Sequence, residues 1–169
     1  MKTRRILLKK FSKDDINLII DLDGDSDVMK YITLGKARSF NEIKKKSFPR
    51  ILNSYSNGEH YGIFAAYLNS NQTFIGWFQF EKDRDIKNAI EVGWRLKKEF
   101  WGNGYATEVG LALVDKGLKL NKKIVARAMK ENVASINVMK KIGLQFVKEF
   151  YYKPDSNIPD VLYEKNQLI

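Results

Sequence analysis

The stretch FWGNGYATE, Phe100 to Glu108, places Gly102 and Gly104 two residues apart inside a bulky, aromatic run. The segment before it, AIEVGWRL, is typical of a strand, and the segment after it, VGLALVDKGLKL, has the apolar spacing of a helix. Glycine permits a positive φ and lets an anion approach the main chain without meeting a Cβ. Strand, glycine turn and helix in this order therefore predict a helix start whose backbone N–H groups bind an anion, with a plain tight turn as the open alternative.

The two common nucleotide-binding motifs do not fit this turn. A P-loop would end in Gly-Lys-Ser/Thr, and residues 105–107 are Tyr-Ala-Thr. A dinucleotide fingerprint would need Gly or Ala where Thr107 stands. The anion is therefore expected to belong to another class of ligand.

Outward from this turn, the hydrophobic pattern predicts a mixed α/β fold, because three consecutive strands with short polar loops are followed by alternating helices and strands. Capping patterns at Ser12 and Ser39 predict two further helices, and Pro49 is expected to kink or end the second one. The expected strands are residues 4–11, 61–68, 73–80, 89–96, 123–129, 144–152 and 161–165, and the expected later helices are residues 104–119 and 133–142.

Length and composition indicate one soluble domain spanning residues 1–169, since no linker, repeat or low-complexity segment interrupts the chain. The longest apolar run, residues 61–68, is far shorter than the roughly 18 residues of a membrane span. We expect a cytoplasmic protein, because there is no secretory h-region and no cysteine. The absence of cysteine also excludes thiolate metal sites and cysteine nucleophiles, and the net charge of +10 favours an anionic partner.

Several segments together resemble the GNAT acetyltransferases, and specifically their branch similar to the ribosomal-protein N-terminal acetyltransferases. The resemblance rests on RRILLKKF, FIGWFQF, IEVGWRL, WGNGYATE and ENVASINVMKKIGL in this order, and it covers nearly the whole chain. It implies a GNAT acyl-CoA N-acyltransferase fold with a mostly antiparallel sheet of about seven strands, splayed at the fourth strand, and about four flanking helices. It implies N-acetyltransferase activity with acetyl-CoA as co-substrate and no metal.

The resemblance implies that the pyrophosphate of acetyl-CoA binds at the glycine turn. The implied contacts are Trp101, Gly102, Asn103, Gly104, Tyr105, Ala106 and Thr107. The family pattern has Gln or Arg three positions before the first glycine, and this chain has Glu99 there. Lys97 and Lys98 are therefore expected to assist the phosphates.

The resemblance also implies a pantetheine site on the strand before the turn and on the later helix. Gly93 inside IEVGWRL marks a bulge or a close backbone approach, and Trp94 and Leu96 are the implied backbone contacts. On the helix the implied contacts are Asn132, Ser135 and Met139. Asn132 also suits an N-cap, and Gly143 suits the C′ position of the same helix.

Acetyl transfer to an amine needs a base, a polarised carbonyl and a proton for the departing thiolate. Without cysteine, direct attack in a ternary complex is the simpler scheme, with a backbone N–H near residues 92–94 polarising the carbonyl. Glu91 is the first candidate base, because partial burial on its strand would raise its pKa, and His60 is the second. Ser135 is the candidate for holding or protonating the thiolate, since Met139 stands where many family members carry tyrosine.

Two other functions stay open: an acyl-CoA sensor without catalysis, and a basic nucleic-acid-binding domain, although no nucleic-acid motif is present. The acceptor is expected to be an amine, on a protein N-terminus or a small molecule, and the protein a monomer or homodimer. The first two helices and the loop at residues 154–160 are expected to choose the acceptor. Asp23, Asp25 and Asp27 are candidates for attracting a cationic amine.

Overall fold

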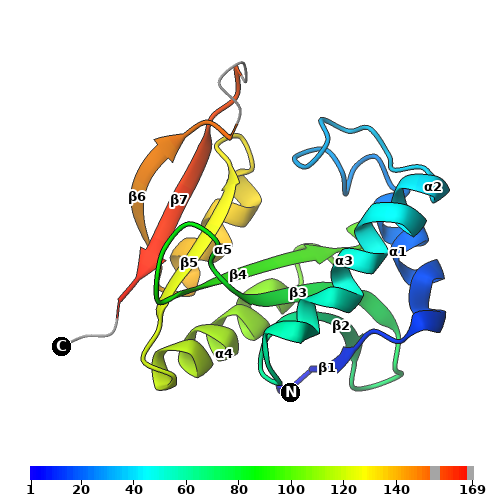
Figure 1. The fold of residues 1–169 in the computed structure, drawn as a ribbon, viewed down its shortest axis with the longest axis horizontal. Helices are drawn as coiled ribbons and strands as arrows, with labels where there is room; N and C mark the ends of the chain where they lie inside the picture. The colour runs from blue at the N-terminus through cyan, green and yellow to red at the C-terminus, as the bar shows by residue number, and fades with distance from the viewer. Residues whose placement is uncertain (153–156, 167–169) are drawn as a thin grey trace.

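A computed structural model describes residues 1–152 and 157–166 of the chain. Its centre is one seven-stranded sheet with the spatial order β1-β2-β3-β4-β5-β7-β6 (Figure 1). The strands are β1 (Ile6–Lys10), β2 (Gly62–Leu68), β3 (Phe74–Lys82), β4 (Ala89–Leu96), β5 (Lys123–Met129), β6 (Gln145–Phe150) and β7 (Asp160–Lys165). The mixed α/β fold predicted from the hydrophobic pattern is confirmed.

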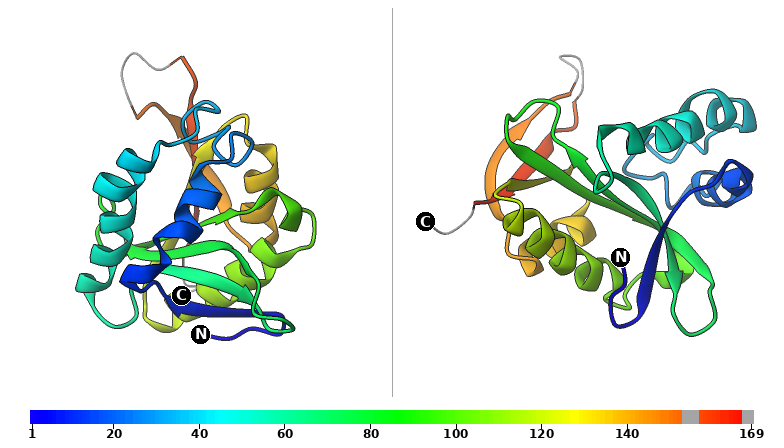
Figure 2. Two further views of the ribbon diagram at one scale, coloured as in Figure 1. Left: turned by 90° about the vertical axis from the view of Figure 1, so that its right-hand side faces the viewer. Right: turned by 60° about the horizontal axis from the view of Figure 1, so that its bottom comes forward.

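The sheet is antiparallel except between β4 and β5, where the described strands pair in parallel. This parallel pairing covers only three positions and ends at Glu91 opposite Val125. Beyond that point the two strands separate, and the halves of the sheet open like a V (Figures 1 and 2). The splay expected at the fourth strand is therefore present, and it follows Glu91 directly.

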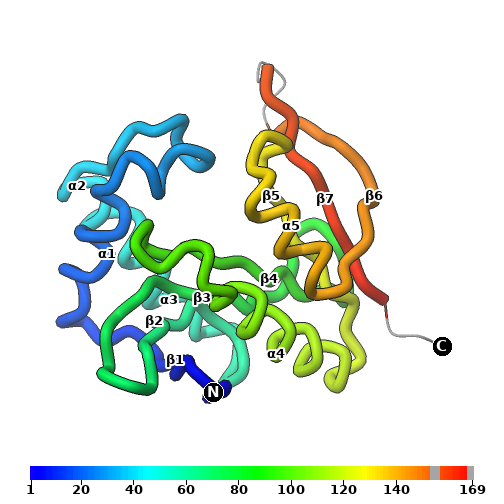
Figure 3. The backbone as a smooth tube through the Cα atoms, turned by 180° about the vertical axis from the view of Figure 1, so that it is seen from behind, coloured from blue at the N-terminus to red at the C-terminus, as the bar shows by residue number. Residues whose placement is uncertain are grey.

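Helices cover both faces of the sheet, with α1 to α3 on one side and α4 and α5 on the other (Figures 2 and 3). The helices are α1 (Ile16–Asp23), α2 (Phe40–Glu42), α3 (Phe48–Asn53), α4 (Tyr105–Lys119) and α5 (Val133–Lys141). Two apolar clusters fill the two interfaces, one around Phe78 and Phe80 beneath α4 and α5, and one around Ile63 beneath α1 and α3. Apolar burial on both faces thus holds the sheet between its helices.

The predicted capping boxes at Ser12 and Ser39 are both present. Pro49 does not end the helical stretch, which continues through it to Asn53. A π-helical turn at Ile43–Ser47 lies directly before the proline, which occupies the first turn of α3. At this position its missing N–H costs little. If α2, the π-helical turn and α3 are counted as one unit, the described residues form four helical units, with α1, α4 and α5 as the other three. This is the number that was expected.

Candidate active site

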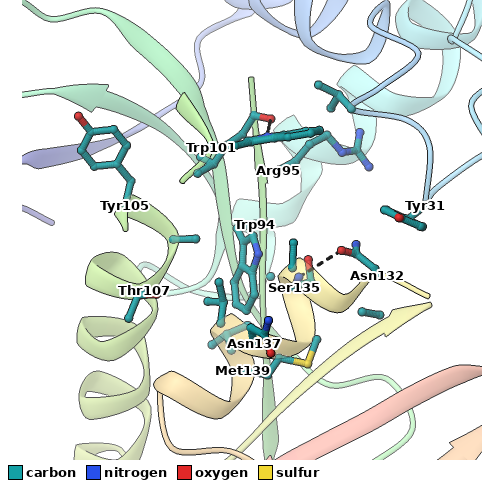
Figure 4. Close-up of a pocket in the computed structure, with 18 of the residues that line it drawn as sticks. Tyr31, Trp94, Arg95, Trp101, Tyr105, Thr107, Asn132, Ser135, Asn137 and Met139 are labelled. Atoms are coloured by element: carbon teal, nitrogen blue, oxygen red, sulfur yellow. Dashed lines mark hydrogen bonds between the residues drawn. The ribbon is translucent and has the colours of Figure 1, made fainter. Parts of the chain in front are cut away.

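A cavity of about 500 Å³ opens where β4 and β5 separate. Its walls come from the separating strands β4 and β5, the neighbouring strand β3, the turn before α4 with the first turn of that helix, helix α5, and the loop after α1 (Figure 4). Eleven of the predicted site residues line it: Glu91, Trp94, Leu96, Trp101, Gly102, Gly104, Tyr105, Ala106, Thr107, Asn132 and Ser135. Met139 lines it as well, whereas Asn103 does not.

The edge of β4 presents backbone groups to this cavity. Lys97 donates its N–H to Ile75 at 2.9 Å, so the odd-numbered residues of β4 bond to β3. Hydrogen bonding alternates along a strand. The N–H and C=O groups of Val92, Trp94 and Leu96 therefore point away from β3, toward the edge of β4 where β5 no longer pairs with it. The Leu96 carbonyl accepts a hydrogen bond from the Trp101 indole at 2.8 Å. The backbone of Val92 and Trp94 is thus the open part of this edge.

The glycine turn has the backbone conformation that requires glycine. Gly102 and Gly104 have φ values of 76° and 77°, in the left-handed region. A Cβ built on Gly102 would meet nothing within 4 Å, and one on Gly104 would meet only the Arg5 guanidinium at 3.6 Å. Packing within the chain therefore does not demand glycine here, whereas the left-handed conformation does, and the space beside both residues is open.

The start of α4 offers unpaired amides to the same space. The first backbone bond of the helix runs from Glu108 N–H to the Gly104 carbonyl at 3.0 Å. The N–H groups of Tyr105, Ala106 and Thr107 precede it, so they have no partner within the helix. Three amides at the positive end of a 15-residue helix favour an anion.

An ion pair between distant parts of the chain fixes this turn. Arg5 Nε lies 2.6 Å from Glu108, whose other oxygen accepts from the Arg5 backbone N–H and from Thr3. The Arg5 side chain also donates to the Asn103 carbonyl at 3.1 Å and stacks on Tyr105. The expected ligand contact Asn103 thus faces the β1 side, where its side chain bonds to the Trp101 carbonyl.

The two lysines expected to assist the phosphates lie elsewhere. Lys97 pairs with Asp21 at 2.9 Å, and Lys98 pairs with Asp27 at 2.6 Å. Neither lines the cavity. Both lysines instead connect the end of β4 to α1 and the loop that follows it.

Helix α5 forms the opposite wall of the cavity. The Asn132 side chain accepts from Ser135 N–H at 3.1 Å, so the predicted N-cap is present (Figure 4). Ser135 and Met139 lie on the same face of the helix as Asn132, and they project toward the ring of Trp94 (Figure 4). The Ser135 hydroxyl makes no hydrogen bond to another described residue and is free to turn toward a ligand.

Glu91 lies at the point where β4 and β5 part, with a quarter of its side chain exposed. One carboxylate oxygen accepts from Gln79 Nε2 at 3.1 Å, and the other lies 3.3 Å from Arg127 Nη1. Glu91 is therefore partly buried, as expected, and polar side chains hold its carboxylate. Arg127 is itself 6% exposed and pairs with the fully buried Asp83.

The charge of Arg127 is permanent. Burial lowers the pKa of its guanidinium, but the hydrogen bond to Asp83 and the charge of Glu91 outweigh burial and raise it. The pKa of Asp83 is in turn lowered, because its bonds to Arg127 and to two backbone N–H groups outweigh the effect of burial. Arg127 thus orients Glu91 from across the gap between the strands.

Other predicted residues lie outside this arrangement. His60 does not line the cavity, and its carbonyl accepts from Lys116. Asp23 is 1% exposed and paired with Arg38 and Arg95. The prediction that its carboxylate attracts amines from solvent is therefore wrong. Asp25 accepts backbone N–H groups of its own loop, whereas Asp27 does line the cavity. Of the loop at 154–160, residues 154–156 lie outside the described residues.

Sequence reasoning did not select several residues of the cavity wall, among them Tyr31, Trp77, Arg95 and Arg127. One signal could have found Arg95, because it stands two and four positions from Gly93 and Glu91 on the same face of a predicted strand. Arg127 gave no local signal, because its partners belong to β4 and to the loop before it.

Within residues 1–152 and 157–166, no group of acidic, histidine or cysteine side chains has the arrangement of a metal site. No helix in the same residues has the length and apolarity to cross a membrane.

Comparisons with known proteins agree on one family. Residues 5–145 match the family model described as an acetyltransferase (GNAT) domain. The chain is 31% identical over 153 residues to an uncharacterized N-acetyltransferase, YnaD, of Bacillus subtilis, covering 89% of this chain and 84% of that protein.

Solved structures give the same result. A GNAT-family acetyltransferase from Bacillus anthracis superposes with a TM-score of 0.79 at 26% identity, covering 99% of this chain and 98% of that one. The ribosomal L7/L12 α-N-protein acetyltransferase in complex with coenzyme A gives a TM-score of 0.78 at 16% identity, covering 97% and 95%. At that identity the second likeness concerns the fold alone.

Proposed function

Because the chain belongs to the GNAT acetyltransferases, which use acetyl-CoA, we propose that residues 1–169 form one catalytic domain that acetylates a primary amine by direct attack in a ternary complex. One observation carries the proposal. The open backbone of β4 at Val92 and Trp94 faces the same cavity as the unpaired amides at the start of α4. An extended amide-containing chain that ends in a pyrophosphate matches both features.

In this proposal the turn binds the pyrophosphate and β4 binds the pantetheine. Gly102 and Gly104 supply the space for phosphate oxygens, which accept from the amides of residues 105–107. The pantetheine amides bond to the edge of β4 as an added strand would. Asn132 and Ser135 contact it from α5, and Met139 supplies an apolar wall.

The chemistry then follows from the splay. The amine nitrogen attacks the thioester carbonyl carbon, the new N–C bond forms, and the C–S bond breaks. A backbone N–H of residues 92–94 polarises the carbonyl oxygen. Glu91 takes the proton of the amine through a water molecule. The hydroxyl of Ser135 donates its proton to the departing thiolate and regains one from water. All residues of the cavity belong to one chain, so the proposed site is complete in either a monomer or a homodimer.

A second function, binding of acyl-CoA without transfer, is favoured by one observation. The side chain of Met139 has no acidic proton to donate. It lines the cavity at the position where many family members carry a tyrosine that serves as the acid. In our proposal, the hydroxyl of Ser135 takes over the role of that tyrosine.

The test follows the thiol released from acetyl-CoA in the presence of a panel of primary amines. Because the chain contains no cysteine, every new thiol belongs to CoA. We expect thiol release that depends on the amine, and a loss of roughly a hundredfold in kcat for Glu91→Gln, since a general base contributes about that much. Glu59→Gln, at an exposed carboxylate outside the cavity, is the control and should behave as the parent.

Binding of acetyl-CoA without turnover of any amine would favour the sensor function. Equal rates for Glu91→Gln and the parent would remove Glu91 from the mechanism.

A further inference from the structure

Three alternate residues of β4 form part of the cavity wall on the face that α1 and α3 cover: Glu91, Gly93 and Arg95. Because side chains alternate along a strand, a carboxylate and a guanidinium flank a position with no side chain. On β3, Gln79 lies opposite Gly93 and Trp77 lies opposite Arg95. This face of β4 is distinct from the open backbone edge of the same strand at Val92 and Trp94.

Arg95 is held firmly but is incompletely paired. Its side chain is 12% exposed, and its Nη1 lies 2.5 Å from Asp23 Oδ1. Asp23 is shared, because Arg38 Nη1 lies 3.2 Å from its other oxygen. Two guanidinium groups thus share one buried carboxylate, which leaves an excess of positive charge beside the cavity.

The Arg95 guanidinium also has unused donors. Its Nε is buried and has no hydrogen-bond partner among the described residues. Its Nη2 makes no hydrogen bond there either, and it is not among the buried atoms. Its planar group lies 4.9 Å from the ring centre of Trp77, which fixes its orientation. A cation withdrawn from water with donors unused is costly, and an anionic oxygen would satisfy it.

We propose that Arg95 binds a carboxylate of the acceptor, and that the acceptor is therefore a small amine with a carboxylate close to its amino group. This inference rests on the proposed function and specifies its second substrate. The amine lies over Gly93, within reach of Glu91, and the carboxylate lies against Arg95. Two residues of a strand span roughly 7 Å, so the two groups of the acceptor are a few bonds apart.

The charges of the cavity argue against a polycationic acceptor. Two acidic residues line the described cavity, Asp27 and Glu91. Each already has a basic partner, Lys98 for Asp27 and Arg127 for Glu91. A polyamine would therefore meet carboxylates that are already paired and the cation of Arg95, which shares its carboxylate with Arg38.

The experiment compares alanine with alaninamide as acceptors, which differ in the carboxylate, by release of CoA thiol. The parent protein should prefer alanine in kcat/KM, and Arg95→Met should lower the alanine-to-alaninamide ratio by roughly tenfold to a hundredfold, as expected for a hydrogen bond between charged groups. Comparing ratios between proteins removes the difference in basicity of the two amines. Arg50→Met is the matched control, because Arg50 pairs with Glu81, makes no contact with Asp23 and does not line the cavity, and it should keep the parental ratio.

Spermidine and trialanine complete the panel. Turnover of spermidine or trialanine in preference to alanine would overturn the acceptor class while leaving the acetyltransferase proposal intact. An unchanged ratio in a folded Arg95→Met would do the same. If that variant does not fold, a parental preference for alaninamide over alanine is the overturning result. Thiol release with none of these amines or of the wider panel would instead contradict the proposed function itself.

Discussion

Gly104 meets a structural requirement of its turn and, in our proposal, a ligand-binding requirement as well. Its left-handed conformation was expected from the sequence, because two glycines at the mouth of a helix have few other uses. The empty space beside Gly102 and Gly104 was not deducible, since the sequence equally suited a turn packed against other side chains. This space is what distinguishes a ligand cradle from a plain turn.

Gly104→Asn separates the two requirements, because asparagine tolerates the left-handed conformation better than other residues with a side chain. We expect the variant to keep its fold and to lose affinity for acetyl-CoA, since the new side chain enters the space meant for phosphate. Calorimetric titration with acetyl-CoA measures the affinity, and a thermal melt checks the fold. Undiminished affinity in the folded variant would assign Gly104 to the turn alone.

Glu108 is a second residue whose role depends on distant partners. Although burial raises its pKa, hydrogen bonds from Thr3 and Arg5 lower it further, so its folded pKa lies below the unfolded value. The resulting stability is present above the unfolded pKa of about 4.3 and is lost as pH falls through the lower folded value. At pH 7 we expect Glu108→Gln to reduce the free energy of unfolding by roughly 1.5 kcal/mol or more.

Urea denaturation of Glu108→Gln and the parent at several pH values checks this. The difference should be constant near neutral pH and should shrink below about pH 4. Glu59→Gln should show no such pH-dependent difference, because Glu59 is exposed and contacts no charged group among the described residues. A difference for Glu108→Gln that is independent of pH would contradict the charge-based explanation.

At the scale of elements, β4 combines most of the site, and hydrophobic patterning predicted it well. Its bounds, its glycine and its separation from the next strand were all expected from IEVGWRL and the family resemblance. The polar contacts between elements were not, because the Arg5–Glu108 bond joins residues 103 apart and the Arg127–Glu91 pair bridges two strands. The periodicity of apolar residues indicates which face of an element is buried. It does not indicate which charged side chains pair between distant elements.

The pair of Arg127 and Asp83 fastens β5 to the loop before β4, beside the point where the strands part. Because Arg127 is 6% exposed and Asp83 is fully buried, Arg127→Met leaves a buried carboxylate without its cation. We expect a loss of roughly 3–5 kcal/mol in the free energy of unfolding, measured with urea. Adding Asp83→Asn to Arg127→Met should recover part of it, whereas a double variant no more stable than Arg127→Met would contradict the unpaired charge as the cause.

For the whole molecule, we propose that two substrates enter one cavity from opposite faces of the sheet. The α4 and α5 side offers amides and open strand edge, and the α1 and α3 side offers Glu91, Arg95 and the loop that contains Tyr31. The separation of β4 from β5 connects the two sides, so the reacting groups can meet only there. This division explains why the glycine motif predicts the co-substrate while the acceptor depends on residues brought together by folding.

A crystal structure with CoA bound tests this arrangement most directly. We predict pyrophosphate oxygens within hydrogen-bond distance of the amides of residues 102–107, and pantetheine amides paired with the backbone of Val92 and Trp94. The thiol should lie beside Ser135 at the separation of the strands. CoA bound away from the β4 edge, or with its pyrophosphate outside the glycine turn, would contradict the account.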